Sequence, residues 1–309
     1  RQPSNKLIIE IFCPVKECSM KNATFLLVLG LVLAGASRVS AQSTSPTASA
    51  PRLQIAEIRF EGNRLFSGSL LTARIKQCIA GFQKDEPSVY RSEVFEYCLN
   101  GLANYERSQG YLQARFGEPK LQEVGQALVV TIESTEGILY RVGNVTVEGA
   151  DHVPEAEIRE MLGMNRGDIA SAEKIARTLF EDLKAVYGDK GFIQYTAEID
   201  PAFRSEPGAA EGVVDFKIIV EEGDRFKLRK ISFKGDNLPE SEVRQLLLVR
   251  EGDVYSQKSF EESIRRINET GWFNRVDKDK DVDYRTNEEE KLVDVVIKLS
   301  TRDVTLRGY

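Results

Sequence analysis

Few residues in this sequence could carry out acid–base chemistry or bind a metal ion. The single histidine, His152, stands in a polar turn, where a surface position explains it better than catalysis. Asp215 and Asp294 occupy equivalent places in two apolar segments, and a structural position facing solvent is the simpler interpretation. After residue 41 the sequence contains no CxxC, HExxH or GxSxG motif and no glycine-rich phosphate loop followed by lysine. We therefore expect a protein that is not an enzyme and that uses no cofactor or metal ion.

Cysteine is the other residue type with reactive chemistry. Two of the four cysteines lie in the first 19 residues, which leaves Cys78 and Cys98 in the part that follows. In an oxidising compartment these two could form a disulfide, and the alternative is a pair of free, buried thiols. The sequence leaves both outcomes open, because a disulfide requires Cα atoms roughly 5.5 Å apart.

The N-terminal region has the features of a secretory signal peptide. A start near Met20 is followed by the apolar segment 23–36 and by small residues up to Ala41. The apolar segment is too short to span a bilayer, which needs about 20 residues. We expect residues 1–19 to be upstream sequence, export to follow cleavage after Ala41, and residues 42–52, rich in Ser, Thr, Ala and Pro, to form a flexible linker.

The rest of the chain repeats itself with a period of about 86 residues. Three sets of markers recur in the same order: an alternating apolar–polar segment that ends in glycine, a glycine followed by an aromatic residue, and a Glu-Gly pair. The first set is IRFEGN at 58–63, VTVEGA at 145–150 and ISFKGD at 231–236. The second set is Gly110-Tyr111, Gly191-Phe192 and Gly271-Trp272, and the third is Glu136-Gly137 and Glu222-Gly223.

Each repeat contains the pattern of a strand, two helices and two further strands. The alternating segment predicts a half-buried strand, and its glycine predicts a turn with positive φ. The segments PEAEIREML (154–162) and PESEVRQLL (239–247) predict the same first helix with proline in its first turn. An amphipathic second helix follows, then a short strand that begins at the Gly-aromatic pair. The third strands are the most continuously apolar and are expected at the centre of the sheet: 128–133, 213–220 and 292–299.

The sequence thus predicts an α+β protein of three tandem β-α-α-β-β modules, each a three-stranded mixed sheet with two helices on one face. The expected modules cover residues 53–137, 138–223 and 224–301. Residues 302–309 are expected to be a tail or the start of a following β-barrel.

This organisation resembles the tandem POTRA domains of the BamA-type outer-membrane protein assembly family. The phrases VEGA and FKGD, the PEAEIRE and PESEVRQ helices, and the GF and GWF turns carry the resemblance, which covers residues 53–301. The first module departs from the pattern, with a longer inter-helix segment (80–91), no opening proline and two cysteines. In this family a β-barrel normally follows the POTRA domains, so the chain is expected to be part of a longer protein or a relative made of POTRA domains alone.

The resemblance implies a periplasmic scaffold, associated with the outer membrane, that binds unfolded outer-membrane proteins and subunits of an assembly complex. A POTRA-only envelope adaptor or division protein is the alternative. Nucleic acid is not expected as a partner, because the net charge of −6 lacks the basic surface that phosphates require.

An open three-stranded sheet also supports strand addition without the family name, because its edge leaves unpaired N–H and C=O groups. The expected edges are 111–116, 192–199 and 272–276, unless neighbouring modules or charges cover them. The charged run 277–281 is expected to be a solvated stretch beside the third edge. The candidate binding residues are Tyr111, Leu112, Ala114, Phe116, Phe192, Gln194, Thr196, Trp272, Phe273 and Arg275.

Overall fold

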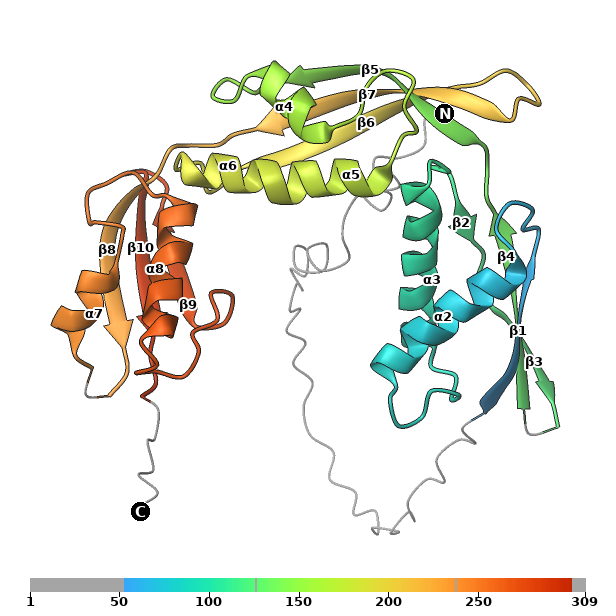
Figure 1. Ribbon diagram of the computed structural model, residues 1–309, viewed down its shortest axis with the longest axis horizontal. Coiled ribbons are helices and arrows are strands. Elements are labelled where there is room, and N and C mark those ends of the chain that lie inside the picture. The colour runs from blue at the N-terminus through green and yellow to red at the C-terminus, as the bar shows by residue number, and fades with distance from the viewer. Residues whose placement is uncertain (1–52, 126, 237, 302–309) are drawn as a thin grey trace, which may run out of the picture. The chain divides into compact units, whose positions relative to one another are not determined.

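The computed structural model describes residues 53–125, 127–236 and 238–301. The expected signal peptide, linker and C-terminal tail lie outside these described residues. The chain divides into two compact units, one ending at Tyr140 and one beginning at Arg141, and each is described by itself. The first unit contains the first module, and the second unit contains the second and third modules (Figure 1).

The first module has two helices on one face of a mixed sheet (Figure 1). Strand β4 lies between β1 and β2, and β3 also pairs with β4. Strand β1 is parallel to β4, while β2 and β3 are antiparallel to it. The elements are β1 (Gln54–Glu61), α2 (Gly68–Phe82), α3 (Ser92–Ser108), β2 (Arg115–Phe116), β3 (Lys120–Val124) and β4 (Ala127–Thr135).

The helices of this module pack their apolar stripes on the sheet. Ser67 caps α2, because its side chain accepts a hydrogen bond from the N–H of Leu70. The core combines residues from α2, α3 and the central strand: Ile75, Ile79, Phe95, Leu99, Leu128, Val130 and Ile132. Cys78 and Cys98 are joined by a disulfide between α2 and α3, with Cα atoms 5.8 Å apart.

The second module repeats this arrangement with a sheet order β5-β7-β6. Its second helix is a continuous run in which one π-helical turn, η1, separates α5 from α6. Strand β6 pairs antiparallel with β7 along its whole length. The elements are β5 (Leu139–Glu148), α4 (Glu155–Leu162), α5 (Ala172–Arg177), η1 (Thr178–Asp182), α6 (Leu183–Asp189), β6 (Thr196–Arg204) and β7 (Glu211–Glu221).

The third module has the sheet order β8-β10-β9, with β8 parallel and β9 antiparallel to β10. Its core is formed mainly by apolar residues of α8 and the sheet, including Phe260, Ile264 and Val295. The elements are β8 (Lys227–Lys234), α7 (Glu240–Leu246), α8 (Gln257–Glu269), β9 (Val282–Asn287) and β10 (Leu292–Lys298). The expected α+β fold is confirmed, with the third strand of each repeat at the centre of its sheet.

The first module differs from the expectation of three strands, because its second strand is divided into β2 and β3. Gly117 and Pro119 lie in the break between them. Proline cannot donate a backbone hydrogen bond to a neighbouring strand, which explains why the pairing with β4 stops and then resumes.

The repeated glycine after each first strand has a steric cause. Gly62 and Gly149 have φ values of +82° and +78°. A Cβ atom at Gly149 would lie 2.2 Å from the carbonyl oxygen of Val220, and one at Gly62 would lie 2.6 Å from that of Ser134. At Gly235 the corresponding distance, to the oxygen of Leu299, is 2.1 Å. The turn therefore passes directly over the end of the central strand, where a side chain has no room.

Candidate functional site

The described residues contain no candidate metal site. Within them, no group of three His, Cys, Asp or Glu side chains is arranged to hold a metal ion. In the same residues, no helix has the length and apolar character needed to cross a membrane.

The two aspartates of the central strands hold local structure together. Asp215 accepts the N–H of Asn144 at 2.7 Å and pairs with Arg204 at 2.6 Å. The Asn144 N–H, followed by the Arg204 guanidinium, lowers the pKa of Asp215. Asp294 pairs with Arg229 at 2.7 Å, which lowers its pKa in the same way. Both carboxylates link the central strand to neighbouring strands of its sheet.

The Glu-Gly markers have a structural role that sequence reasoning missed. Glu136 is 5% exposed and accepts hydrogen bonds from the backbone N–H groups of Arg64, Leu65 and Phe66, with shortest distances of 2.8–2.9 Å. It therefore fixes the turn between β1 and α2 from the far end of β4. In the first two modules, the carbonyl that faces the turn glycine belongs to the residue two positions before the Glu-Gly pair. The recurrence of this pair was the signal in the sequence that could have revealed the clamp.

Glu222 occupies the same position in the second module, where it binds His152. The N–H of His152 donates to one carboxylate oxygen at 2.8 Å, and the ring Nδ1 lies 2.5 Å from the other. The ring also packs against Phe192, with centroids 4.5 Å apart. His152 is therefore a half-exposed partner of a structural carboxylate, rather than an isolated surface residue.

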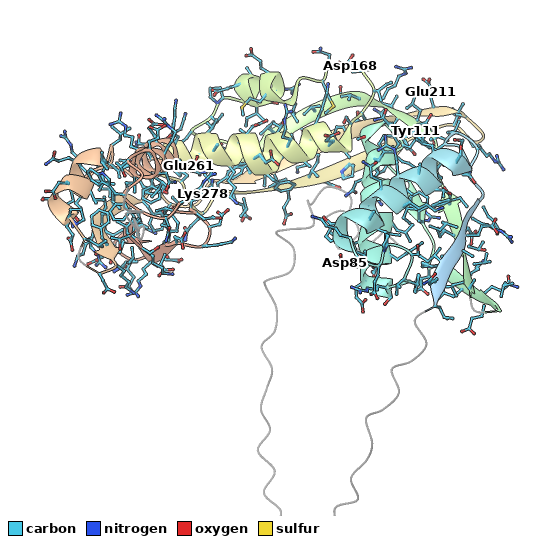
Figure 2. All side chains as sticks on the ribbon, turned by 60° about the horizontal axis from the view of Figure 1, so that its bottom comes forward. Asp85, Tyr111, Asp168, Glu211, Glu261 and Lys278 are labelled. Carbon is cyan, nitrogen blue, oxygen red and sulfur yellow. A yellow bond between two sulfur atoms is a disulfide. The ribbon has the colours of Figure 1, made fainter. Side chains whose placement is uncertain are left out.

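The expected edge residues of the first module do not form a free edge. Tyr111 begins a turn in which the N–H of Ala114 donates to the carbonyl of Tyr111, and its ring packs against Phe66 (Figure 2). Leu112 and Ala114 are completely buried, and only Phe116 lies in a strand. The predicted strand at 111–116 is wrong except at its last two residues, because the side chains after Gly110 complete the core.

The second expected edge is right in part. Phe192 is buried, and Gln194 donates a hydrogen bond to Glu288 at 2.9 Å. The strand begins only at Thr196, which is exposed, and it continues to Arg204.

The third expected edge is wrong. Trp272 is exposed and Phe273 is buried, and Phe273 makes an isolated bridge with Thr301. Arg275 lies in a loop that Asn268 holds, because its side chain binds the N–H and C=O of Val276. The charged run 277–281 is a surface turn, tied to α8 by Lys278 and Glu261 at 2.5 Å (Figure 2).

The outer strands that the structure provides in place of these segments are β3, β6 and β9. All five residues of β3 are exposed, including Leu121 and Val124 at 49% and 55%. Strand β6 is longer but contains Pro201. Strand β9 has six residues, and Asp283 and Arg285 place charges on it.

Loops cover the start of each first strand, which forms the opposite edge of its sheet. The N–H of Ile55 donates to Ser88, that of Val142 to Asp168, and that of Leu228 to Asp253. In the third module, side chains cover the next edge position as well. Glu251 accepts the N–H of Ile231 at 2.9 Å, and Arg244 donates to its carbonyl at 2.9 Å.

The first module is more open at this position. Thr72 of α2 corresponds to Arg244 of α7, because each directly follows a buried residue on the first helix of its module. Its hydroxyl reaches the carbonyl of Ile58 at only 3.5 Å. The result is an open groove of about 660 Å³ between β1 and α2, lined by Ile58, Arg59, Phe60, Glu61, Gly68, Ser69, Thr72, Ala73 and Lys76.

These features define a class of protein built from small repeated modules, in which two helices cover one face of a mixed sheet and its edges remain partly open. The model of the POTRA family, described as a surface antigen variable number repeat, matches residues 140–223 and 226–302. The chain belongs to the POTRA family.

Three comparisons describe its similarity to known proteins. The chain is 26% identical over 251 residues to a putative outer membrane protein assembly factor of Treponema pallidum, covering 79% of this chain and 29% of the relative. It is 25% identical over 229 residues to the outer membrane protein assembly factor BamA of Neisseria meningitidis, covering 72% and 28%. The crystal structure of Haemophilus influenzae BamA POTRA3-5 is 24% identical with a TM-score of 0.63, over 82% of this chain and all of that one. The chain thus spans less than a third of the length of these curated relatives.

Proposed function

We propose that this chain is a periplasmic scaffold of outer-membrane protein assembly, exported by its signal peptide, that binds unfolded outer-membrane proteins and partner subunits by strand addition. The proposal is supported by membership of the POTRA family and by similarity to two proteins described as outer membrane protein assembly factors. A further support is the presence of outer strands whose edges neighbouring strands leave unpaired.

The edge of β3 is the observation that favours one binding position over the others. Natural edge strands are commonly protected by charge, proline or a covering segment. Pro201 removes one donor from the free edge of β6, because a proline within a sheet is tolerated where its missing N–H faces outward. Strand β3 carries the charges of Lys120 and Glu123, but it contains no proline and exposes the apolar side chains of Leu121 and Val124. We therefore assign client binding to β3 of the first module.

The hairpin geometry identifies the backbone groups that would receive the added strand. Val124 and Ala127 are partners separated by two residues, so they close the hairpin as a hydrogen-bonded pair. Hydrogen-bonded and non-hydrogen-bonded positions alternate along an antiparallel pair of strands. The backbone N–H and C=O groups of Gln122 therefore point toward β4, and those of Leu121 and Glu123 point outward. Those two residues offer both hydrogen bonds and an apolar contact to an extended peptide.

The test replaces Glu123 by proline, which removes an outward N–H without removing a hydrogen bond to β4. A photo-crosslinking residue at Leu121 reports capture of a denatured outer-membrane protein. We expect Glu123→Pro to reduce the crosslinked product at least about tenfold, the effect of losing about 1.4 kcal/mol of binding free energy. Its circular dichroism spectrum should be unchanged.

Glu123→Ala is the matched control, because it removes the same side chain and keeps the N–H. It should crosslink as the unchanged protein does. Undiminished crosslinking in Glu123→Pro would exclude the β3 edge and move the search to β6 or to the groove beside β1.

A further inference from the structure

Helix α3 of the first module buries a carboxyl group that has no hydrogen-bond partner. Glu106 is completely buried, and neither of its carboxyl oxygens forms a hydrogen bond with any described residue. An ionised carboxylate in such a position is strongly disfavoured, because burial removes its water without supplying donors. Burial therefore favours the protonated form of this group.

A second carboxylate, that of Glu136, increases this preference. Burial first, and the charge of Glu136 second, raise the pKa of Glu106 to about 7. The carboxylate oxygens of Glu136 accept hydrogen bonds from the three backbone N–H groups of residues 64–66. Because the charge of Glu136 acts on Glu106, the pair is more stable with Glu106 protonated than with both groups ionised.

Charged residues from the surrounding elements do not neutralise Glu106. Arg107 on the same helix opposes the rise in its pKa, but its guanidinium donates to the carbonyl of Ala114 and the side chain of Asn104. Arg74 of α2 stacks on the ring of Tyr105, with its guanidinium carbon 3.5 Å from the ring centre.

The second module has a tyrosine at the equivalent position. Glu106 and Tyr187 both lie four residues before the helix-ending glycine, and their carbonyls accept equivalent hydrogen bonds from Tyr111 and Phe192. The buried hydroxyl of Tyr187 has no hydrogen bond of ordinary geometry, yet its approach helps to lower the pKa of Glu222. The first module thus replaces a tyrosine, which carries its proton throughout the neutral range, with a second carboxyl group.

We propose that Glu106 and Glu136 form a proton-dependent latch, in which the proton on Glu106 allows Glu136 to hold the turn between β1 and α2. When the proton leaves, two negative charges face each other in a buried site, and the repulsion is relieved by release of the turn. The proposal concerns the fold of the first module and does not depend on what binds at the sheet edges.

The latch controls the segment that leads into α2. Phe66 in this turn packs edge-on against both Tyr105 and Tyr111, with centroids 5.8 and 5.3 Å away. The next residues, Ser67 and Gly68, begin the helix that lines the groove beside β1. Release of the turn therefore loosens the aromatic cluster and one wall of this groove.

The direction of the pH dependence follows from the raised pKa. The folded protein holds the proton more tightly than the unfolded chain does, so the stabilisation is complete below the ordinary value of 4.5 and is lost as the pH rises through about 7. The three N–H groups bound to Glu136 are direct reporters of this loss.

Hydrogen–deuterium exchange of the full exported chain from pH 6 to pH 8.5, corrected for the intrinsic exchange rate, tests the proposal. Protection of the amides of Arg64, Leu65 and Phe66 should fall about tenfold over this range, as titration near pH 7 requires. The amide of Asn144, bound to Asp215, is the internal control and should keep its protection, because the lowered pKa of Asp215 keeps this carboxylate ionised throughout the range.

Two variants separate the latch from a general effect of pH. Glu106→Gln keeps the shape without a titratable proton, and Glu106→Tyr supplies the residue of the second module. Protection at residues 64–66 should then change less than about twofold, because neither variant carries the carboxyl group whose proton is lost in this range. Constant protection in the unchanged protein, or an equal fall in a folded variant, would overturn the proposal. A carbon-13 titration of the Glu106 carboxyl group decides the matter directly, and an apparent pKa near the ordinary value would also overturn it.

Discussion

Asp189 at the end of α6 accepts a hydrogen bond from the hydroxyl of Ser256 at 2.6 Å. It also accepts the N–H of Lys258 in the first turn of α8 at 3.1 Å. Ser256 is itself the N-cap of α8 and accepts the N–H of Ser259. A carboxylate of the second module therefore completes the cap of a helix in the third, where the partial positive charge of the helix N-terminus favours it.

Replacing Asp189 by alanine should destabilise the third module. The change leaves the Lys258 N–H without its partner and removes a negative charge from the helix N-terminus, so we expect a loss of about 1–2 kcal/mol in the free energy of unfolding. Trp272 is the only tryptophan in the chain and lies in the third module, so its fluorescence during urea denaturation measures this loss.

Asp182→Ala is the matched control, because Asp182 lies about two turns earlier in the same helical run and makes a 3.6 Å contact with Arg177 at the surface. Its effect should stay within about 0.5 kcal/mol, as for most exposed ion pairs. An equal effect of both substitutions would mean that the cap on α8 contributes nothing.

The turn glycines permit a second matched comparison. Gly149 and Gly208 have nearly the same positive φ, +78° and +79°. A Cβ atom at Gly208 would meet nothing within 4 Å, whereas one at Gly149 would lie 2.2 Å from the oxygen of Val220. Gly208→Ala should therefore cost only the conformational strain of about 1–2 kcal/mol.

Gly149→Ala should cost this strain and, in addition, about 1–3 kcal/mol for the displacement of the backbone. Urea denaturation followed by circular dichroism gives both values. Equal losses in the two variants would show that the close approach of the turn to the central strand is not a constraint.

The repeats could be predicted from the sequence because their signals are local. A turn that allows no side chain selects glycine in every copy, as at Gly62 and Gly149, whatever surrounds it. Continuous apolar sequence likewise placed the central strands, since each of them is paired with neighbouring strands on both sides.

The outer strands could not be predicted in the same way, because tertiary contacts decide where each one begins. Leu112 and Phe273 come shortly after helix-ending glycines and are residue types that are common in strands. Both side chains are buried in the core, and the outer strands begin only after them. The Glu-Gly pair marks the position of the clamp by Glu136 but not its partners, which lie about 70 residues away, and the burial of Glu106 has no local signature.

The disulfide of the first module should contribute to its stability through the unfolded state. Cys78 and Cys98 are separated by 20 residues and join two helices that are already in contact. A loop of this length corresponds to about 3 kcal/mol in the chain-entropy estimate. We expect reduction to lower the free energy of unfolding of this module by about that amount, measured by hydrogen exchange of α2 and α3 amides. The Cys78→Ser, Cys98→Ser double variant should reproduce the loss and should not respond to reductant.

The pairing of Cys78 with Cys98 can also be tested by counting free thiols. Under denaturing, non-reducing conditions a protein of residues 42–309 should contain no free cysteine, since both of its thiols are used in the disulfide. Two reactive thiols per chain would contradict the pairing and remove the expected effect of reductant.

The clamp of the second module should respond to pH in the opposite direction from that of the first. Burial alone would raise the pKa of Glu222, but the backbone N–H and ring of His152, together with Tyr187, lower it overall. A lowered pKa means that the unfolded chain binds the proton more tightly. The stabilisation is therefore present above the ordinary value of 4.5 and is lost as the pH falls through the folded-state pKa.

Glu222→Gln removes this titration while keeping the shape of the side chain. Many other carboxylates also titrate in acid, so the informative quantity is the difference in unfolding free energy between the two proteins from pH 7 to pH 3. We expect the unchanged protein to be more stable at pH 7 by about 1–3 kcal/mol, the usual cost of losing a buried charged acceptor. This advantage should shrink on acidification, because protonated Glu222 no longer accepts the His152 N–H as a carboxylate. A difference that stays constant with pH would show that the hydrogen bonds from His152 do not depend on the charge of Glu222.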